Sequence, residues 1–285
     1  MENIRQNPLH KYFRQPKIYL RLPSSGNFYP DGAIEKTENG EYPVYSMTAK
    51  DEIVMKTPDA LMNGQATVDI IQSCVPNIKD AWQVPSIDLD AILVAIRIAT
   101  YGEMLDVSTT VPGLDEERTY ETDLRLVLDK LINATFDTVC KIDDTFEVRI
   151  RPLNYAEFTK NSTRSLEEQR IIQIVNDDGL DDAAKLERFA SSFRKLTEIT
   201  INMVSAGIMS VSTPEGVVSD PEFIQEFVNN ADKNILTSII AHLDEQKKKF
   251  NIEPFKVQSL PEEIEKGAPA EFEVPITLDS SNFFA

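Results

Sequence analysis

The segment that most constrains the fold of this chain is an apolar run that begins near residue 86 and ends at Gly102. Its apolar side chains recur at helical spacing. They are Leu89, Ile92, Leu93, Ile96 and Ala99 on one face, and Ala91, Val94, Ala95 and Ile98 over much of the other. A helix that is apolar nearly all round is usually buried. The run is too short to span a bilayer and contains Arg97, so it predicts the central helix of a soluble core.

Two shorter helices are predicted before this central helix, and both are expected to pack against it. Thr48 followed by Asp51 is typical of a capped helix start. Thr57-Pro58 predicts a second start, and Asn63-Gly64 is expected to end that helix. A third short helix is indicated between Gln65 and Cys74.

The start of the central helix is also predicted. Ser86 is expected to be its N-cap residue. Asp88 and Asp90 would then lie favourably near the positive end of the helix dipole.

Several segments of the chain are similar to a known family. They are KIYLRLPSSGNFYP from residue 17, KTPDALMNG from residue 56, SCVPNIKD from residue 73, PSIDLDAILVAIRIATYGE from residue 85 and ITLDSSNFFA from residue 276. In this order they resemble the T4-type phage baseplate hub protein family. The resemblance implies a structural virion protein that binds other baseplate and hub proteins, in multiple copies within a symmetric assembly. It also implies a place in the tail baseplate, after assembly in the host cytoplasm.

Two other classes of function stay open beside this interpretation: a baseplate assembly chaperone that is absent from the mature virion, and a tail-associated cell-wall hydrolase. Catalytic motifs such as GxSxG, HExxH and the P-loop are absent from the sequence, and its two histidines, His10 and His242, have no nearby cysteine or serine elbow. Paired carboxylates such as Asp177 and Asp178 occur where turns and helix starts favour Asp. We therefore predict no catalytic residues and no cofactor.

Charge argues against a nucleic-acid partner. The 285 residues carry a formal net charge of −18, and an acidic chain does not follow a phosphate backbone. The charge is uneven, because residues 1–22 hold five basic side chains against one acidic one. A basic arm on an acidic body is expected to meet an acidic surface, on this subunit or on a neighbour. The alternative is a solvated tail.

Cysteine usage argues against a metal site. Cys74 and Cys140 are isolated from each other, which is typical of small buried residues in a reducing compartment. Members of the resembled family can carry cysteine pairs at knuckle-like positions, but this chain has none there. We predict no metal site, no signal peptide and no membrane span.

The pattern along the chain predicts an α+β protein, with a mainly helical core, small β-hairpins and extended N- and C-terminal arms. Four regions are expected. They are a basic arm and β-hairpin segment at 1–46, a helical core region at 47–135, a region with a hairpin and long helices at 136–250, and an extended tail at 251–285.

The strand predictions rest on alternation and on turn signals. Lys17–Leu22 alternates as a half-buried strand does, and Asn39-Gly40 predicts a hairpin between 33–38 and 41–45. Residues 107–122 are expected to be irregular. Further strands are predicted at 139–142 with 145–150, at 209–218, at 255–257 and at 272–274.

Long helices are predicted in the second half of the chain. Asn154 with Glu157 is typical of a capping box, and the helix that it opens is expected to run to about residue 176, with a break near 161–165. Asp181 to Ala206 is predicted to be the longest helix. Its apolar positions include Leu186, Phe189, Phe193, Leu196 and Met203. Asp220 and Asp232 are expected to cap two further helices.

Two distant segments share a layout. Residues 109–129 and 257–279 each contain a turn with a DEE or PEE run, then a strand, then a Leu-Asp ending. The alternative is that these are two unrelated acidic loops.

Candidate partner-binding residues lie at both ends of the chain and in one loop. The arm carries basic and aromatic side chains but no evident means of folding alone, and two large apolar groups stand at the other end, where chains usually fray. Trp82 lies in a loop between prolines, where it either anchors a partner or covers its own core. The candidates are Arg5, Lys11, Tyr12, Phe13, Arg14, Trp82, Phe283 and Phe284.

Overall fold

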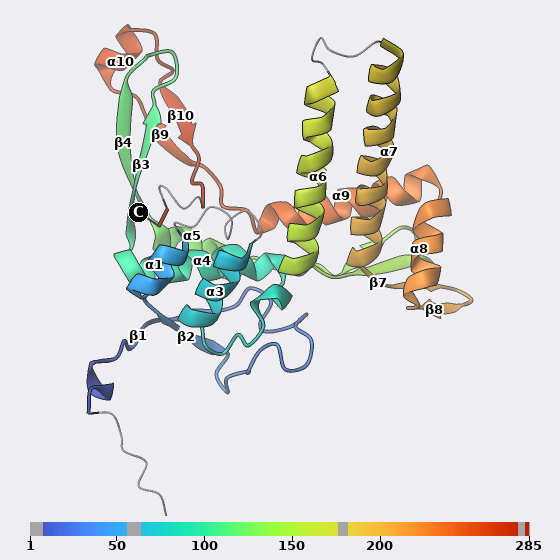
Figure 1. Cartoon of the computed structure of the whole chain (residues 1–285), viewed down its shortest axis with the longest axis horizontal. Helices are drawn as coiled ribbons and strands as arrows, with labels where there is room; N and C mark the ends of the chain where they lie inside the picture. The colour runs from blue at the N-terminus through green and yellow to red at the C-terminus, as the bar shows by residue number, and fades with distance from the viewer. Residues whose placement is uncertain (1–7, 56–63, 176–181, 279–282, 285) are drawn as a thin grey trace, which may run out of the picture.

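The structure is a computed structural model that describes residues 8–55, 64–175, 182–278 and 283–284 (Figure 1). Helices and small antiparallel sheets are mixed along the chain, so the predicted α+β class is confirmed. The helix expected from Thr57-Pro58 to Asn63 lies outside the described residues. Among the described helices, none is both long and apolar enough to cross a membrane.

The predicted central helix is α4, Ser86–Tyr101, and it lies within the larger cluster of buried side chains. From Ala91 to Ala99 every side chain is buried, and this includes Arg97. The helix ends at Gly102, whose φ of 95° would strain any other residue. The prediction of a buried central helix is therefore confirmed.

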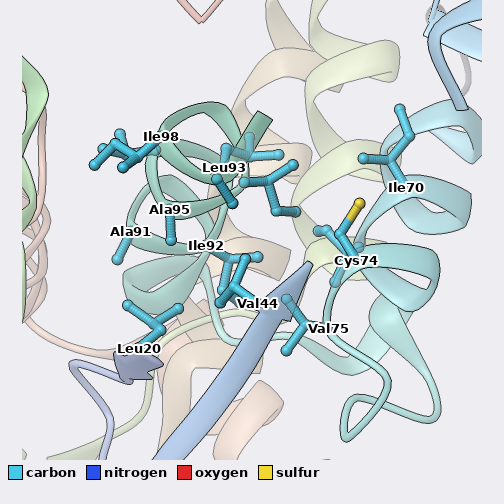
Figure 2. Close-up of a cluster of buried hydrophobic side chains, with 14 of the residues drawn as sticks. Leu20, Val44, Ile70, Cys74, Val75, Ala91, Ile92, Leu93, Ala95 and Ile98 are labelled. Atoms are coloured by element: carbon cyan, nitrogen blue, oxygen red, sulfur yellow. The ribbon is translucent and has the colours of Figure 1, made fainter. Parts of the chain in front are cut away.

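Helices and a small sheet surround α4. The contacting elements are β1 (Pro16–Arg21), β2 (Glu41–Tyr45), α3 (Gln65–Cys74) and α5 (Leu124–Asn133), with α1 (Ala49–Met55) packed on α3. Figure 2 shows how Leu20 and Val44 of the sheet and Cys74 of α3 approach Ile92 of α4. The core therefore joins segments from β1 to α5.

The sheet beside α4 pairs its strands differently from our prediction. Strand β2 pairs antiparallel with β1, and Leu20 lies opposite Tyr42. The hairpin expected between 33–38 and 41–45 around Asn39-Gly40 is therefore wrong. Pairing with β1 forms a sheet whose Leu20 and Tyr42 are both buried, and a local turn signal carries no information about that burial.

The capping prediction for α4 is also wrong. Pro85 occupies the N-cap position, and no side chain caps the helix. The backbone N–H of Ser86 donates instead to the carbonyl of Leu153 at 2.8 Å. A distant segment therefore satisfies the group that we expected a local cap to serve.

Asp88 has a different role from the dipole partner that we expected. Its buried carboxylate accepts hydrogen bonds from the Ser24 N–H at 2.7 Å, the Ser24 hydroxyl at 2.5 Å and the Tyr29 hydroxyl at 3.0 Å. These bonds tie the loop after β1 to the first turn of α4. The loop contains two residues at positive φ, Ser25 and Phe28, so Asp88 holds a backbone conformation that is rare without glycine.

The segment at 107–122 is ordered, so the prediction of an irregular piece is wrong. Strands β3 (Met104–Thr110) and β4 (Glu117–Asp123) form an antiparallel hairpin. Strands β9 (Phe255–Gln258) and β10 (Glu271–Val274) form a second hairpin, with the short helix α10 (Pro261–Glu265) between them. The extended segments predicted at 255–257 and 272–274 are therefore confirmed.

These two hairpins, which we call the paired hairpins, lie side by side and project from the core (Figure 1). Arg118 contacts both carboxylate oxygens of Glu263 at 3.1 Å. Tyr120 and Phe272 meet edge to face, with ring centroids 5.8 Å apart. The two segments with a shared layout therefore pack against each other, although about 150 residues separate Arg118 from Glu263.

A second buried cluster lies around a four-stranded antiparallel sheet with the order β5-β6-β7-β8. The strands are β5 (Val139–Lys141), β6 (Glu147–Ile150), β7 (Ile208–Thr213) and β8 (Gly216–Val218). Helices α8 (Pro221–Asn230) and α9 (Lys233–Lys249) pack on this sheet. The side chains of Asp220 and Asp232 cap these helices, as predicted.

Two long helices, α6 (Tyr155–Val175) and α7 (Asp182–Gly207), stand side by side and project away from both clusters (Figure 1). The capping box at the start of α6 is confirmed, because Asn154 and Glu157 exchange backbone-to-side-chain hydrogen bonds of 3.0 and 2.8 Å. The break expected near 161–165 is absent from α6.

Side chains from three of the four predicted regions share the first buried cluster. It takes Leu20, Ile96 and Phe283, among others, from segments far apart in the sequence. The second cluster takes its residues from 140–239. The division at 46, 135 and 250 stays a prediction. Cys74 and Cys140 are both buried, as expected.

Burial of Asp88 predicts a pH-dependent stability. Burial raises its pKa from 3.8 to about 6, although hydrogen bonds from Ser24 and Tyr29 act in the opposite direction. Between these pH values the folded chain holds a proton that the unfolded chain has lost. The contribution of Asp88 to the free energy of unfolding therefore falls as the pH rises, by about 3 kcal/mol in total. Urea unfolding at a series of pH values measures this loss.

The matched variant is Asp88→Asn, which removes the titrating group. Its free energy of unfolding should change less with pH than that of the wild type, by the same amount. Asp90, whose pKa burial also raises to about 6, is present in both proteins and cancels from the difference. An identical pH dependence in the two proteins would contradict the assignment.

Candidate interaction surfaces

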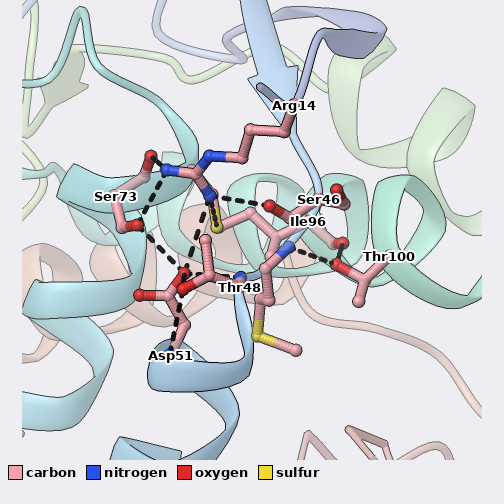
Figure 3. Close-up of polar contacts among 9 residues, drawn as sticks. Arg14, Ser46, Thr48, Asp51, Ser73, Ile96 and Thr100 are labelled. Carbon is pink, nitrogen blue, oxygen red and sulfur yellow. Dashed lines mark hydrogen bonds and ion pairs between the residues drawn. The ribbon is translucent and has the colours of Figure 1, made fainter. Parts of the chain in front are cut away.

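Arg14 joins the N-terminal arm to the core (Figure 3). Its guanidinium donates to the Ser46 carbonyl at 2.7 Å, and to the carbonyl and hydroxyl of Ser73 at 2.5 and 2.9 Å. One guanidinium nitrogen lies 3.6 Å from the Asp51 carboxylate. Arg14 therefore holds the arm against α1 and α3 by contacts within its own chain.

The anchor for Arg14 is itself a capped helix start. The carboxylate of Asp51 accepts from the Thr48 N–H at 2.7 Å, the Thr48 hydroxyl at 2.8 Å and the Ser73 hydroxyl at 3.0 Å. The capped start predicted from Thr48 and Asp51 is thus confirmed. Burial and the nearby Asp51 raise the pKa of the Cys74 thiol to about 12, so this thiol stays protonated at neutral pH.

Beyond Arg14 the arm presents aromatic side chains to solvent. The 3-10 turn η1, His10–Tyr12, leads away from the core (Figure 1). Tyr12 is 74% exposed and Phe13 is 51% exposed. The Lys11 ammonium lies 4.9 Å from the centre of the Tyr12 ring. The arm residues therefore divide: Arg14 belongs to the core, Lys11, Tyr12 and Phe13 lie at the surface, and Arg5 is outside the described residues.

Trp82 lies against its own core. It belongs to the 3-10 turn η2 (Ala81–Gln83), and its ring stacks on Tyr155 with centroids 5.5 Å apart. Gly64, at φ 80°, lies so close that an added Cβ would stand 3.3 Å from the Trp82 ring. The indole thus fills the space between α3, η2 and the start of α6, which is the second of the two roles considered for it.

Phe283 and Phe284 are buried, so our premise that they stand exposed at a frayed end is wrong. They are 0% and 4% exposed, and their rings meet edge to face at 5.0 Å. The Phe284 carbonyl accepts a hydrogen bond from the Tyr101 hydroxyl at 3.2 Å. The end of α4 provides an apolar site for these rings, a contact that no local pattern indicates.

No described feature assembles a chemical site. Within the part of the chain that the structure describes, no three His, Cys, Asp or Glu side chains are grouped to hold a metal ion. His242 lies 3.2 Å from the carbonyl of Asp137 in α9, far from the arm that carries His10. A cavity of about 130 Å³ between β3 and the Pro275–Thr277 segment is lined by backbone and by Phe283. The surfaces therefore indicate binding of partners.

Removal of the Arg14 side chain should loosen the arm. We expect Arg14→Ala to lose about 1–3 kcal/mol of unfolding free energy, because Asp51 and the Ser73 hydroxyl lose their partner. Amide hydrogen exchange at residues 8–13 should become faster. Arg21→Ala is the control, because Arg21 pairs with Glu41 at the surface and should contribute about 0.5 kcal/mol or less. Equal effects of the two variants would contradict the anchor.

The buried rings at the C-terminal end predict a large effect on stability. Phe283→Ala should reduce the free energy of unfolding by about 3–5 kcal/mol, since it leaves a cavity inside the first cluster. Phe223→Ala on α8 is the control, because that ring is exposed and should contribute little. Chemical denaturation measures both variants. A wild-type midpoint for Phe283→Ala would show that this ring does not pack on the core.

Comparison with known proteins gives one match. The family model described as T4 bacteriophage base plate protein matches residues 34–259, which is most of the chain. No curated protein and no solved structure is similar enough to match. The matched range contains α4, the second sheet and the α6–α7 pair, whereas the arm lies before it. On this match, the chain belongs to the T4 bacteriophage base plate protein family.

Proposed function

We propose that this protein is a structural subunit of the baseplate hub in a contractile phage tail, where it binds neighbouring baseplate proteins and performs no catalysis. Membership of the base plate protein family supports the general role. The resemblance of several segments to hub proteins supports the finer one. The protein is present in multiple copies in the symmetric assembly, and it belongs to the virion.

The observation that carries this proposal is the arm beyond Arg14. Two aromatic rings, Tyr12 and Phe13, stand exposed on a short turn that is joined to a rigid core. Large aromatic groups dominate the energy of many interfaces once a partner covers them. Because Arg14 fixes the base of the arm, binding costs less conformational entropy than for a wholly free tail.

Charge favours an acidic partner surface for this arm. Residues 1–22 carry a net charge of +4, and the remaining residues carry −22. Basic side chains such as Lys11 speed the encounter with an acidic neighbour, and salt weakens that effect. Lys11, Tyr12 and Phe13 are thus the contact residues of the proposal, while Arg14 positions them. Trp82, Phe283 and Phe284 support the fold from within.

Deletion of residues 1–13 tests the proposal. The deleted chain keeps Arg14, so its free energy of unfolding should stay within about 0.5 kcal/mol of the wild type. Its incorporation into baseplates, measured in cells infected with phage that lack the native gene product, should fall sharply. The double variant Tyr12→Ser/Phe13→Ser should behave in the same way.

The matched control is Tyr19→Ser, because Tyr19 is an exposed tyrosine on the neighbouring strand β1. It should incorporate normally. Full incorporation of the deleted chain would contradict the role of the arm.

Two further assays separate the other function classes. Mass spectrometry of purified virions should detect the protein, whereas an assembly chaperone would be missing from them. A zymogram against peptidoglycan should stay uncleared, whereas a cell-wall hydrolase would produce a cleared band.

A further inference from the structure

The α6–α7 pair is packed with its polar side chains inside. Glu168 of α6 and Ser192 of α7 are both buried in the seam between the helices, and Lys195 donates to Glu168 at 3.0 Å. Of the described side chains from 159 to 200, none belongs to either buried cluster. An isolated helix pair with a polar seam has little apolar burial to hold it together.

The apolar side chains of this pair lie outside. Leu186 is 71% exposed, Phe189 is 39% exposed and Phe193 is 49% exposed, although all three belong to one helix. The rings of Phe189 and Phe193 are 4.6 Å apart, so they form a continuous apolar surface. Leu166 of α6 is also exposed.

The spacing of these residues is that of a coiled coil. Along α7 the positions Leu186, Phe189, Phe193, Leu196, Thr200 and Met203 alternate in steps of three and four, and five of these six residues are apolar. We call them the α7 stripe. A repeat of 3.5 residues places such a stripe against another helix along its whole length, which here is about 26 Å. The stripe therefore fits a helical partner better than a flat surface.

Charge indicates which helical partner. The described residues of α6 hold three basic and three acidic side chains, and those of α7 hold four basic and three acidic ones. The pair thus carries +1, whereas the whole chain carries −18. Two copies of so acidic a chain repel each other over most of their surfaces. The α6–α7 pair is a surface where two copies can approach without that repulsion.

We propose that the α7 stripe is a self-association surface, on which the α6–α7 pair of a second copy of this chain packs to form a four-helix contact. A two-fold contact places the same stripe on both sides, which satisfies the apolar residues of both copies at once. This inference deepens the proposed structural role, because it names a contact between the multiple copies.

Sedimentation of the full-length protein tests the inference. The wild type should form a dimer or a larger closed oligomer in a concentration-dependent way. Phe189→Ser/Phe193→Ser should raise the dissociation constant by about 100-fold or more, since it removes two aromatic anchors from the centre of the contact. Leu126→Ser is the control, because Leu126 is an exposed apolar residue of α5, on another part of the molecule. It should leave the oligomer unchanged.

A crosslinking experiment keeps the test valid if the double variant folds poorly. Arg194→Cys places a thiol beside Phe193 in an exposed part of α7, and both native cysteines are buried. A thiol-specific crosslinker should then join two chains, whereas Glu222→Cys on α8 should give no crosslinked dimer.

Three outcomes would overturn the inference: a wild type that stays monomeric at all concentrations, an oligomer that the stripe variant leaves intact, or crosslinking that is equal at both positions. A monomeric wild type whose stripe variant fails to enter baseplates would assign the stripe to a different baseplate protein. Normal behaviour of the arm deletion together with loss of the dimer in the stripe variant would separate this inference from the proposed role of the arm.

Discussion

Burial of α4 is the constraint on which the rest of the first cluster depends. The helix is apolar on nearly every side, so it must be covered from several directions at once. Strands β1 and β2, helices α3 and α5, and the two terminal phenylalanines provide that cover. Because these segments come from distant parts of the sequence, the hydrophobic requirement of one helix determines how the chain is arranged around it.

Two buried carboxylates hold irregular segments to this apolar core. Asp88 accepts three hydrogen bonds from the loop after β1, and Asp51 lies beside the guanidinium of Arg14 at the base of the arm. A buried carboxylate is costly unless donors surround it, so each segment is held in a defined position relative to the helices. The surface that we assign to partner binding begins where these polar contacts end, at Phe13.

Local signals in the sequence predicted the elements well, and non-local contacts account for the errors. The caps at Asn154, Asp220 and Asp232 involve residues within one helical turn, so the sequence pattern was sufficient to place them. The partner of β2, the order of β3 and the burial of Phe283 depend on segments far away in the chain. For the same reason the polar seam of the α6–α7 pair was invisible in a pattern that marked α7 only as amphipathic.

The second cluster is inserted into the first in the order of the chain. Residues 140–239 lie between the part of the first cluster that ends near Leu131 and the part that begins again near Ile276, apart from Tyr155 at the start of α6. During synthesis the sheet β5-β6-β7-β8 and its two helices are therefore complete before the last side chains of the first cluster leave the ribosome. The larger core closes last, around an already folded unit, and its exposed apolar surface persists for most of translation.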